Sequence, residues 1–239
     1  KSFGELQILT DTNLSLKGGT ITALLGQSGV GKTTLLRILA GLETFDSGEI
    51  FINGSSHEKY LQENRIGFVF QKPILFPWMT LEQNLSLPIN IFGSETERDS
   101  LSNRCRELLS LFQLTGFEEY YPKELSGGMQ QRATVARAMI GNPDLLFLDE
   151  GLGALDEYIR EQLWFEFRKI WKESGLTTIF VTHSIKEAIH LADNVFVFSK
   201  KQKNLNPKIP IDIPKEDFFY ISSLPEYQKI YRQIRTLIE

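Results

Sequence analysis

Residues 26–33 read GQSGVGKT, which matches the pattern G-x-x-x-x-G-K-(S/T). The run before it, ITALL, is apolar and rich in strand formers, and KTTLLRILA after it has apolar residues at helical spacing. Gly26, Gly29 and Gly31 let the backbone turn with its N–H groups pointing inward, because no Cβ blocks the approach. The sequence therefore predicts a strand, a phosphate-binding loop and a helix in that order, as in an α/β fold.

The predicted loop has a defined chemistry. The helix that follows offers its positive N-terminal end to phosphates. Lys32 is expected to reach the β- and γ-phosphates of a nucleotide, and Thr33 to place its hydroxyl on Mg²⁺. A glycine-rich turn that only joins strand to helix is the alternative, which the flanking elements disfavour. The predicted nucleotide-binding residues of this loop are Gly26, Gln27, Ser28, Gly29, Val30, Gly31, Lys32, Thr33 and Thr34.

A second run, LLFLDE at 145–150, is apolar and ends in two acids. This pattern is typical of a buried parallel strand that carries carboxylates to its C-terminal edge. Asp149 is expected to bind Mg²⁺, directly or through water, and Glu150 to polarise the attacking water as general base. Alone, the run would also fit a strand that meets a solvated loop. The phosphate-binding loop upstream favours the catalytic interpretation.

A further anion site is predicted at LSGGMQ (125–130), which precedes residues with an apolar helical face. We predict a helix that begins near Gly127, with Ser126 as its N-cap and its positive end open to an anion. A single phosphate-binding loop would not need this second site. A phosphate wrapped by the loop has one exposed side, which a helix end from another subunit would cover. The two motifs together predict ATP enclosed between two copies of the chain.

The ordered series GQSGVGKT, Gln71, LSGGMQ, LLFLDE, GALD (153–156) and His183 resembles the nucleotide-binding subunit of ABC transporters. The resemblance covers nearly the whole chain. It implies a P-loop NTPase fold with a parallel-sheet core, an antiparallel β subdomain and an inserted helical subdomain. It also implies ATP hydrolysis coupled to transport, with ATP and Mg²⁺ as cofactors.

The resemblance assigns further roles. Gln71 would sense the γ-phosphate and Mg²⁺, and His183 would act as the switch histidine beside the γ-phosphate. Asp156 would close the D-loop, and Phe3 stands where the family places an aromatic that stacks on adenine. Outside this series a lone histidine after a strand usually packs or caps, and an exposed aromatic near a terminus is common. The residues expected to contact the γ-phosphate of the opposite subunit are Ser126, Gly127 and Gly128.

Two segments resemble the nitrate/sulfonate/taurine group of bacterial importers. These are KPILFPWMTLEQNL (72–85), similar to that group's Q-loop extension, and the ending ISSLPEYQKIYRQIRTLIE. We therefore expect the ATP-hydrolysing subunit of an importer for a small anion, with no room in 239 residues for an extra C-terminal regulatory domain. The alternative is the ATPase subunit of another ABC transporter, for a different solute or for export.

The expected partners follow from the same resemblance. The subunit would form a head-to-tail homodimer across ATP and bind integral-membrane permease subunits at the cytoplasmic face of the cell membrane. A solute-binding protein would be an indirect partner. Apolar residues in the 72–85 segment either contact the permease or pack within the helical subdomain; they are Leu75, Phe76, Trp78 and Met79.

Composition and missing motifs argue against several other classes of protein. The net charge of −4 gives no basic footprint for nucleic acid. Cys105 is the single cysteine, so an internal disulfide and a cysteine metal cluster are excluded, and a reducing compartment is favoured. The sequence contains no run of 18 apolar residues, so it predicts no transmembrane helix. No Asn/Thr-Lys-x-Asp element of a GTPase is present, and a single cassette disfavours a translation-associated ABC protein.

We predict one domain for residues 1–239. Residues 1–71 and 141–199 would form the core with the β subdomain, residues 72–140 the helical signature subdomain, and residues 200–239 a connector and a helix. Asn53-Gly54 predicts a hairpin turn. Three features depart from the family pattern: Gly151 replaces the usual proline after the catalytic glutamate, Thr33-Thr34 replaces the more common Ser-Thr, and Ser184 follows the switch histidine, where it can cap the next helix. The start at Lys1 suggests that residues precede it.

Overall fold

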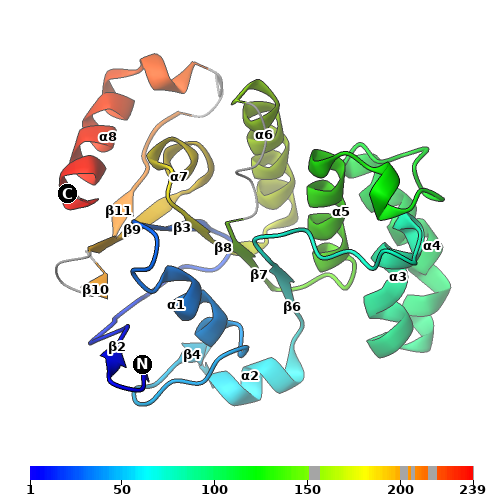
Figure 1. Ribbon diagram of the computed structural model, residues 1–239, viewed down its shortest axis with the longest axis horizontal. Coiled ribbons are helices and arrows are strands. Elements are labelled where there is room, and N and C mark those ends of the chain that lie inside the picture. Colours follow the sequence, from blue (N-terminus) through cyan, green and yellow to red (C-terminus); the bar gives the residue numbers. More distant parts are fainter. Residues whose placement is uncertain (151–156, 200–203, 206–207, 215–219, 239) are drawn as a thin grey trace. The chain divides into compact units, whose positions relative to one another are not determined.

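The computed structural model describes residues 1–150, 157–199, 204–205, 208–214 and 220–238 of the chain. The chain divides into two compact units (Figure 1). The first unit comprises Lys1–Asn64 and Glu161–Glu239, and the second comprises Arg65–Arg160. None of the helices in the described residues is long and apolar enough to cross a membrane.

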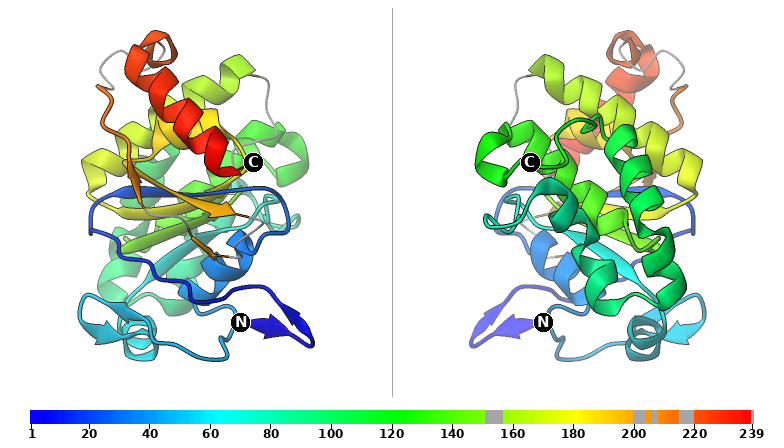
Figure 2. Two further views of the ribbon diagram at one scale, coloured as in Figure 1. Left: turned by 90° about the vertical axis from the view of Figure 1, so that its left-hand side faces the viewer. Right: turned by 90° about the vertical axis from the view of Figure 1, so that its right-hand side faces the viewer.

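The sheet of the first unit has β3 (Ile21–Leu25) paired in parallel with both β8 (Thr177–Thr182) and β9 (Asn194–Ser199). Every residue of β3 is buried, as expected for a strand covered on both faces. Figures 1 and 2 show α1 (Lys32–Leu39) on one face and α7 (Ile185–Leu191) with α8 (Pro225–Ile238) on the other. The predicted strand, loop and helix around GQSGVGKT therefore lie at the centre of this unit.

Shorter elements complete the first unit. Asn53 and Gly54 have φ of 50° and 79°, so they form the predicted tight turn of a β-hairpin. Both central residues of such a turn need positive φ, which Asn and Gly tolerate best. The remaining short elements are β1 (Ser2–Phe3), β2 (Leu6–Gln7), β4 (Phe51–Ile52), β5 (Ser55–Ser56), α2 (His57–Glu63), β10 (Asn204–Leu205), β11 (Ile209–Pro210) and η2 (Ile221–Ser223). The long helix α6 (Glu157–Ser174) has its first four residues in the second unit and the rest in the first.

The second unit places helices in the chain between two parallel strands, β6 (Ile66–Val69) and β7 (Leu145–Asp149). These helices are α3 (Leu81–Phe92), α4 (Glu95–Leu111), the short η1 (Pro122–Glu124) and α5 (Gly127–Met139). A Cβ on Gly67 would lie 2.7 Å from the carbonyl oxygen of Ala138, so the glycine allows α5 to pack closely on β6. The expected parallel-sheet core, antiparallel hairpins and inserted helices are all present. The finer subdomain boundaries remain a prediction.

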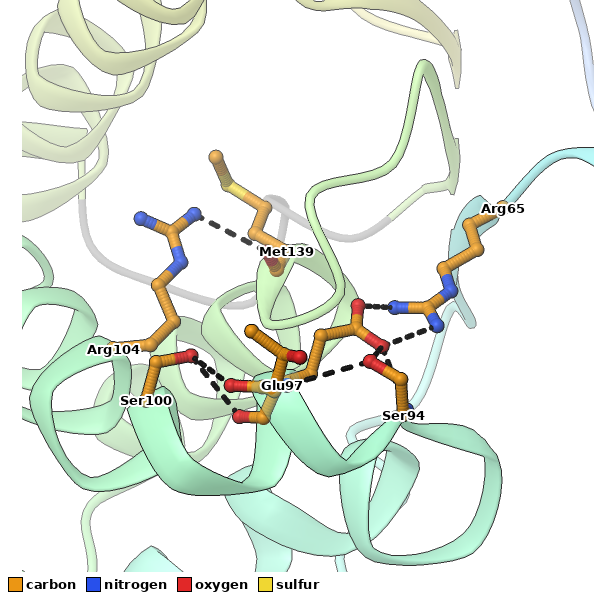
Figure 3. Close-up of polar contacts among 7 residues, drawn as sticks. Arg65, Ser94, Glu97, Ser100, Arg104 and Met139 are labelled. Carbon is orange, nitrogen blue, oxygen red and sulfur yellow. Dashed lines mark hydrogen bonds and ion pairs between the residues drawn. The ribbon is translucent and has the colours of Figure 1, made fainter.

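An ion pair joins the residue before β6 to the first turn of α4. The Arg65 guanidinium donates to both carboxylate oxygens of Glu97, with Nη2 2.8 Å from Oε2. Glu97 also accepts from the backbone and the hydroxyl of Ser94, the N-cap of α4 (Figure 3). The same view shows Arg104 of α4 donating to the carbonyl oxygen of Met139, at 3.4 Å. These contacts tie α4 both to the strand and to α5.

Candidate functional site

The loop between β3 and α1 has the geometry of a phosphate cradle. Gly29 and Gly31 have φ of 79° and 102°, a region that other residues rarely adopt. Lys32 is buried, and its Nζ donates to the carbonyl oxygens of Gly26 at 2.9 Å and Gln27 at 2.8 Å. The N-terminal end of a helix carries a partial positive charge, and no acidic residue lies in the first turn of α1. This end of α1 can therefore receive an anion.

His183 lies at the end of β8, in the same unit as the phosphate-binding loop. The two are linked through the strand pairing, since the Gly26 N–H donates to the carbonyl oxygen of Thr182 at 3.3 Å. The His183 side chain is exposed. Ser184 is the N-cap of α7, as the sequence predicted, and its Oγ accepts from the backbone N–H of Glu187.

Phe3 lies on the β1–β2 hairpin with 48% of its surface exposed. The Lys1 ammonium stands 4.7 Å from the centre of its ring and forms an ion pair with Glu43 at 2.9 Å. The ring is therefore accessible to a flat ligand but already contacts a cation on its own chain. The adenine-stacking role of Phe3 stays a prediction.

In the second unit, β7 delivers Asp149 and Glu150 as predicted. Asp149 is buried at 3% exposure. Glu150 follows with φ of 52°, and its Oε2 accepts a hydrogen bond from Gln71 Nε2 at 2.9 Å. The structure thus brings together the predicted general base, Glu150, and the predicted γ-phosphate sensor, Gln71, which are 79 positions apart in the sequence.

The signature helix α5 begins at Gly127, with Ser126 as its N-cap; Ser126 Oγ accepts from Met129 N at 3.3 Å. A Cβ placed on Gly127 would meet nothing within 4 Å, and no acidic residue lies in the first turn. Gln130 fixes the segment that precedes this helix, because its Nε2 donates to the carbonyl oxygens of Pro122 and Leu125. The helix start is thus open and fixed, as an anion site requires.

The segment from Ile74 to Met79 forms an ordered loop before α3, which we name the aromatic loop. Asn84, fully buried on α3, makes three hydrogen bonds to the backbone of the aromatic loop: it donates to the carbonyl oxygens of Phe76 and Met79 and accepts from Phe76 N. Its Nδ2 also donates to the carbonyl oxygen of Thr80, the N-cap of α3. The aromatic loop therefore has a fixed conformation.

Arg137 holds the same loop from α5. Its guanidinium donates to the carbonyl oxygen of Ile74 and lies 6.0 Å from the centre of the Phe76 ring. Burial lowers the pKa of Arg137 from its ordinary value. Trp78 is 68% exposed and packs beside Phe76, with ring centres 5.4 Å apart. Asn84 and Arg137 therefore fix the backbone of the aromatic loop, from which the exposed Trp78 side chain extends.

Sequence reasoning missed several residues of these sites. Asn84, Arg137 and Gln130 act through bonds from side chain to backbone, which no motif announces. Glu187 had a local signal, because Ser184-x-x-Glu187 matches a capping box. Asp156 and Gly151 lie outside the described residues.

Comparison with known proteins gives consistent results. The ABC transporter domain family matches residues 9–153. The aliphatic sulfonates import ATP-binding protein SsuB of Bacillus licheniformis is 37% identical over 239 residues, which cover 98% of this chain and 89% of that protein. The sulfate/thiosulfate import ATP-binding protein CysA of Gloeobacter violaceus is 39% identical over 242 residues, covering 98% of this chain and 70% of that protein. Among solved structures, the dimeric cassette MJ0796 bound to ADP and phosphate matches with a TM-score of 0.72 and 31% identity over 85% of this chain and 90% of that chain.

Proposed function

The chain belongs to the ABC transporter family of ATP-binding proteins and is an ATPase, and we propose that it powers a bacterial importer for a small anion of the nitrate/sulfonate/taurine type. The observation that carries the proposal is that two helices of one chain, α1 and α5, start at phosphate-type sequence motifs with no acidic residue in their first turns. The names of the sulfonate and sulfate import relatives support import and an oxyanion as solute.

The first unit supplies the proposed phosphate contacts. The backbone N–H groups from Gly29 to Thr33 would surround the β- and γ-phosphates, with Lys32 as the cation. Mg²⁺ prefers oxygen ligands, and the sequence motifs assign this role to the Thr33 hydroxyl and the Asp149 carboxylate. Gln71 would complete this set. When bound, Mg²⁺ would neutralise charge on the phosphate oxygens.

For hydrolysis, we propose that the Glu150 carboxylate accepts a proton from a water as that water attacks the γ-phosphorus. The bond from the γ-phosphorus to its bridging oxygen breaks, and ADP and phosphate leave. Gln71 orients Glu150 through the 2.9 Å hydrogen bond. His183 would contact the γ-phosphate and stabilise the charge that develops on it.

Assembly is also proposed. The open start of α5 in one copy would cover the γ-phosphate held by α1 of a second copy, giving a head-to-tail homodimer with ATP in its interface. The related cassette MJ0796 is dimeric. The aromatic loop would bind a permease at the cytoplasmic face of the cell membrane, because an exposed tryptophan on a fixed backbone is a typical interface anchor. A solute-binding protein would deliver the anion to that permease.

The test is genetic and biochemical together. A strain that lacks this chain is assayed for uptake of labelled taurine, an aliphatic sulfonate, sulfate and nitrate. We expect uptake of one of these anions to be lost, and to be restored by the intact chain but not by Lys32→Ala. Normal uptake of all four anions would contradict the proposed solute class, while ATPase activity of the purified chain reports the enzyme separately.

A further inference from the structure

A buried hydrogen-bond network surrounds the backbone of His183. Thr182 and Glu187 are only 2% and 8% exposed, whereas the side chain of His183 between them in sequence is exposed. The Thr182 hydroxyl donates to the Glu187 carboxylate. The same hydroxyl accepts from the backbone N–H of Ser184 at 3.0 Å. The residues on both sides of His183 are therefore held by one carboxylate and one hydroxyl.

This arrangement differs from an ordinary capping box. In a capping box the third helical residue, here Glu187, accepts directly from the N–H of the N-cap residue, here Ser184. In this chain the Thr182 hydroxyl is inserted between the two groups. A direct bond would fix only the residue after His183. The insertion also fixes the residue before it, which helix capping alone does not require.

The network continues to the phosphate-binding loop. The Thr182 carbonyl oxygen accepts from Gly26 N at 3.3 Å, and Gly26 is the first residue of that loop. The Gly26 carbonyl oxygen in turn accepts from Lys32 Nζ at 2.9 Å. Thr182 therefore stands between the buried carboxylate and the loop that would hold the phosphates.

We propose that Glu187, acting through Thr182, is a positioning residue that sets the place of His183 relative to the γ-phosphate during ATP hydrolysis. The inference rests on the role proposed for His183. Glu187 touches neither nucleotide nor water in this role. Its carboxylate fixes the backbone from which the His183 ring reaches the phosphate, and the ring then needs no reorganisation as charge develops there.

Thr182→Val tests the proposal, since it removes the hydroxyl and preserves the shape. We expect kcat for ATP hydrolysis to fall roughly 10- to 100-fold, the usual effect of a small displacement of a catalytic group, while the Kd for Mg·ATP changes less than about twofold. Thr182→Ser restores the hydroxyl and should restore kcat. Glu187→Gln keeps an acceptor and should stay within about threefold of the unmodified chain.

The matched control is Thr178→Val on the same strand. Within the described residues Thr178 Oγ1 is buried without a hydrogen-bond partner, so its loss should leave kcat unchanged. Melting temperatures are recorded for every variant, and kcat is expressed per folded protein. A lower melting temperature with normal kcat in Thr182→Val would overturn the proposal, because the network would then be structural only.

A double-variant comparison separates this inference from the proposed function. If His183→Ala hydrolyses ATP normally, the role of His183 is wrong. If His183→Ala is impaired and Thr182→Val is not, only the positioning role of Glu187 is wrong. We expect both single variants to be impaired and the double variant to be no slower than His183→Ala. A further loss of kcat in the double variant, equal to that of Thr182→Val alone, would show that Thr182 acts elsewhere.

Discussion

At the scale of single residues, Glu150 combines an unfavourable backbone conformation with a specific side-chain hydrogen bond. Its φ of 52° is left-handed, which costs a residue with a Cβ roughly 1–2 kcal/mol. The turn places the carboxylate beside Gln71, at 2.9 Å. Strained backbone at a strand end often marks a functional position, because stability alone would favour glycine or asparagine there. The strain therefore supports Glu150 as the general base.

We predict that Glu150→Gln binds Mg·ATP as tightly as the unmodified chain but hydrolyses it roughly 10²–10⁴-fold more slowly, because a positioned general base contributes about that factor. The amide can still accept the hydrogen bond from Gln71, so the local geometry should persist. The measurement is steady-state ATPase activity beside equilibrium nucleotide binding. Glu119→Gln removes an exposed carboxylate from the same unit and should hydrolyse ATP normally. Normal turnover in Glu150→Gln would exclude this role.

At the scale of elements, features that depend on a few neighbouring residues could be predicted from the sequence, whereas contacts between distant residues could not. The start of α5 at Gly127 followed from Ser126 and the apolar spacing after it, and the β4–β5 hairpin followed from Asn53-Gly54. Both signals act over a few residues. Arg65 and Glu97 are 32 positions apart, and no sequence motif around either residue indicates that the two form an ion pair. The aromatic loop likewise owes its conformation to Asn84 and Arg137, whose bonds to backbone carbonyls depend on how the helices pack.

The aromatic loop gives an element-scale prediction. Trp78→Ala should leave the isolated subunit folded and able to bind ATP, because 68% of the side chain is exposed. It should weaken binding to the permease by about 2 kcal/mol or more, as truncation of an interface anchor does, and abolish uptake. Melting temperature and co-purification with the permease are measured together.

The matched control for this loop is Phe92→Ala, which removes an aromatic side chain that is 80% exposed at the other end of α3. Uptake should survive in the control. If Trp78→Ala instead lowers the melting temperature sharply while the folded protein still binds the permease, Trp78 is a packing residue and the docking role is wrong.

The ion pair between Arg65 and Glu97 predicts a pH dependence. Hydrogen bonds from Arg65 and then from Ser94 lower the pKa of Glu97 from 4.5 to about 2. A carboxyl group with a lowered pKa stabilises the fold fully above its unfolded pKa and loses that contribution as the pH falls through the folded pKa. The melting-temperature advantage of the unmodified chain over Glu97→Gln should therefore be greatest at neutral pH and shrink as the pH falls from 4.5 towards about 2.

Salt provides the second arm of that experiment. Both side chains are partly exposed, so added salt should also reduce the advantage. Glu107→Gln, which removes a more exposed partner of Arg104 on the same helix, is the control and should show a smaller effect. A melting-temperature difference between the unmodified chain and Glu97→Gln that is constant across pH and salt would contradict an electrostatic origin.

At the scale of the whole molecule, the chain has one phosphate-binding loop, followed by α1, and one signature helix, α5, and neither helix has an acidic residue in its first turn. A symmetric dimer would form two identical composite sites, each using the loop of one subunit and the signature of the other. Lys32→Ala removes the cation of the loop. Ser126→Arg removes the N-cap and puts a long side chain in front of the helix start.

Mixing these two variants tests the arrangement. In a heterodimer of Lys32→Ala and Ser126→Arg, both lesions fall in one site and the other site is intact. We therefore expect ATP-dependent association, measured by sedimentation in a Glu150→Gln background, to be weak in either variant alone and partly restored in the mixture. Ser102→Arg, on an exposed part of α4, should associate normally. Association that is equally weak in the mixture and in the single variants would contradict the head-to-tail site. Association is measured before ATP turnover, because hydrolysis that requires both sites would be lost even in a correctly assembled mixture.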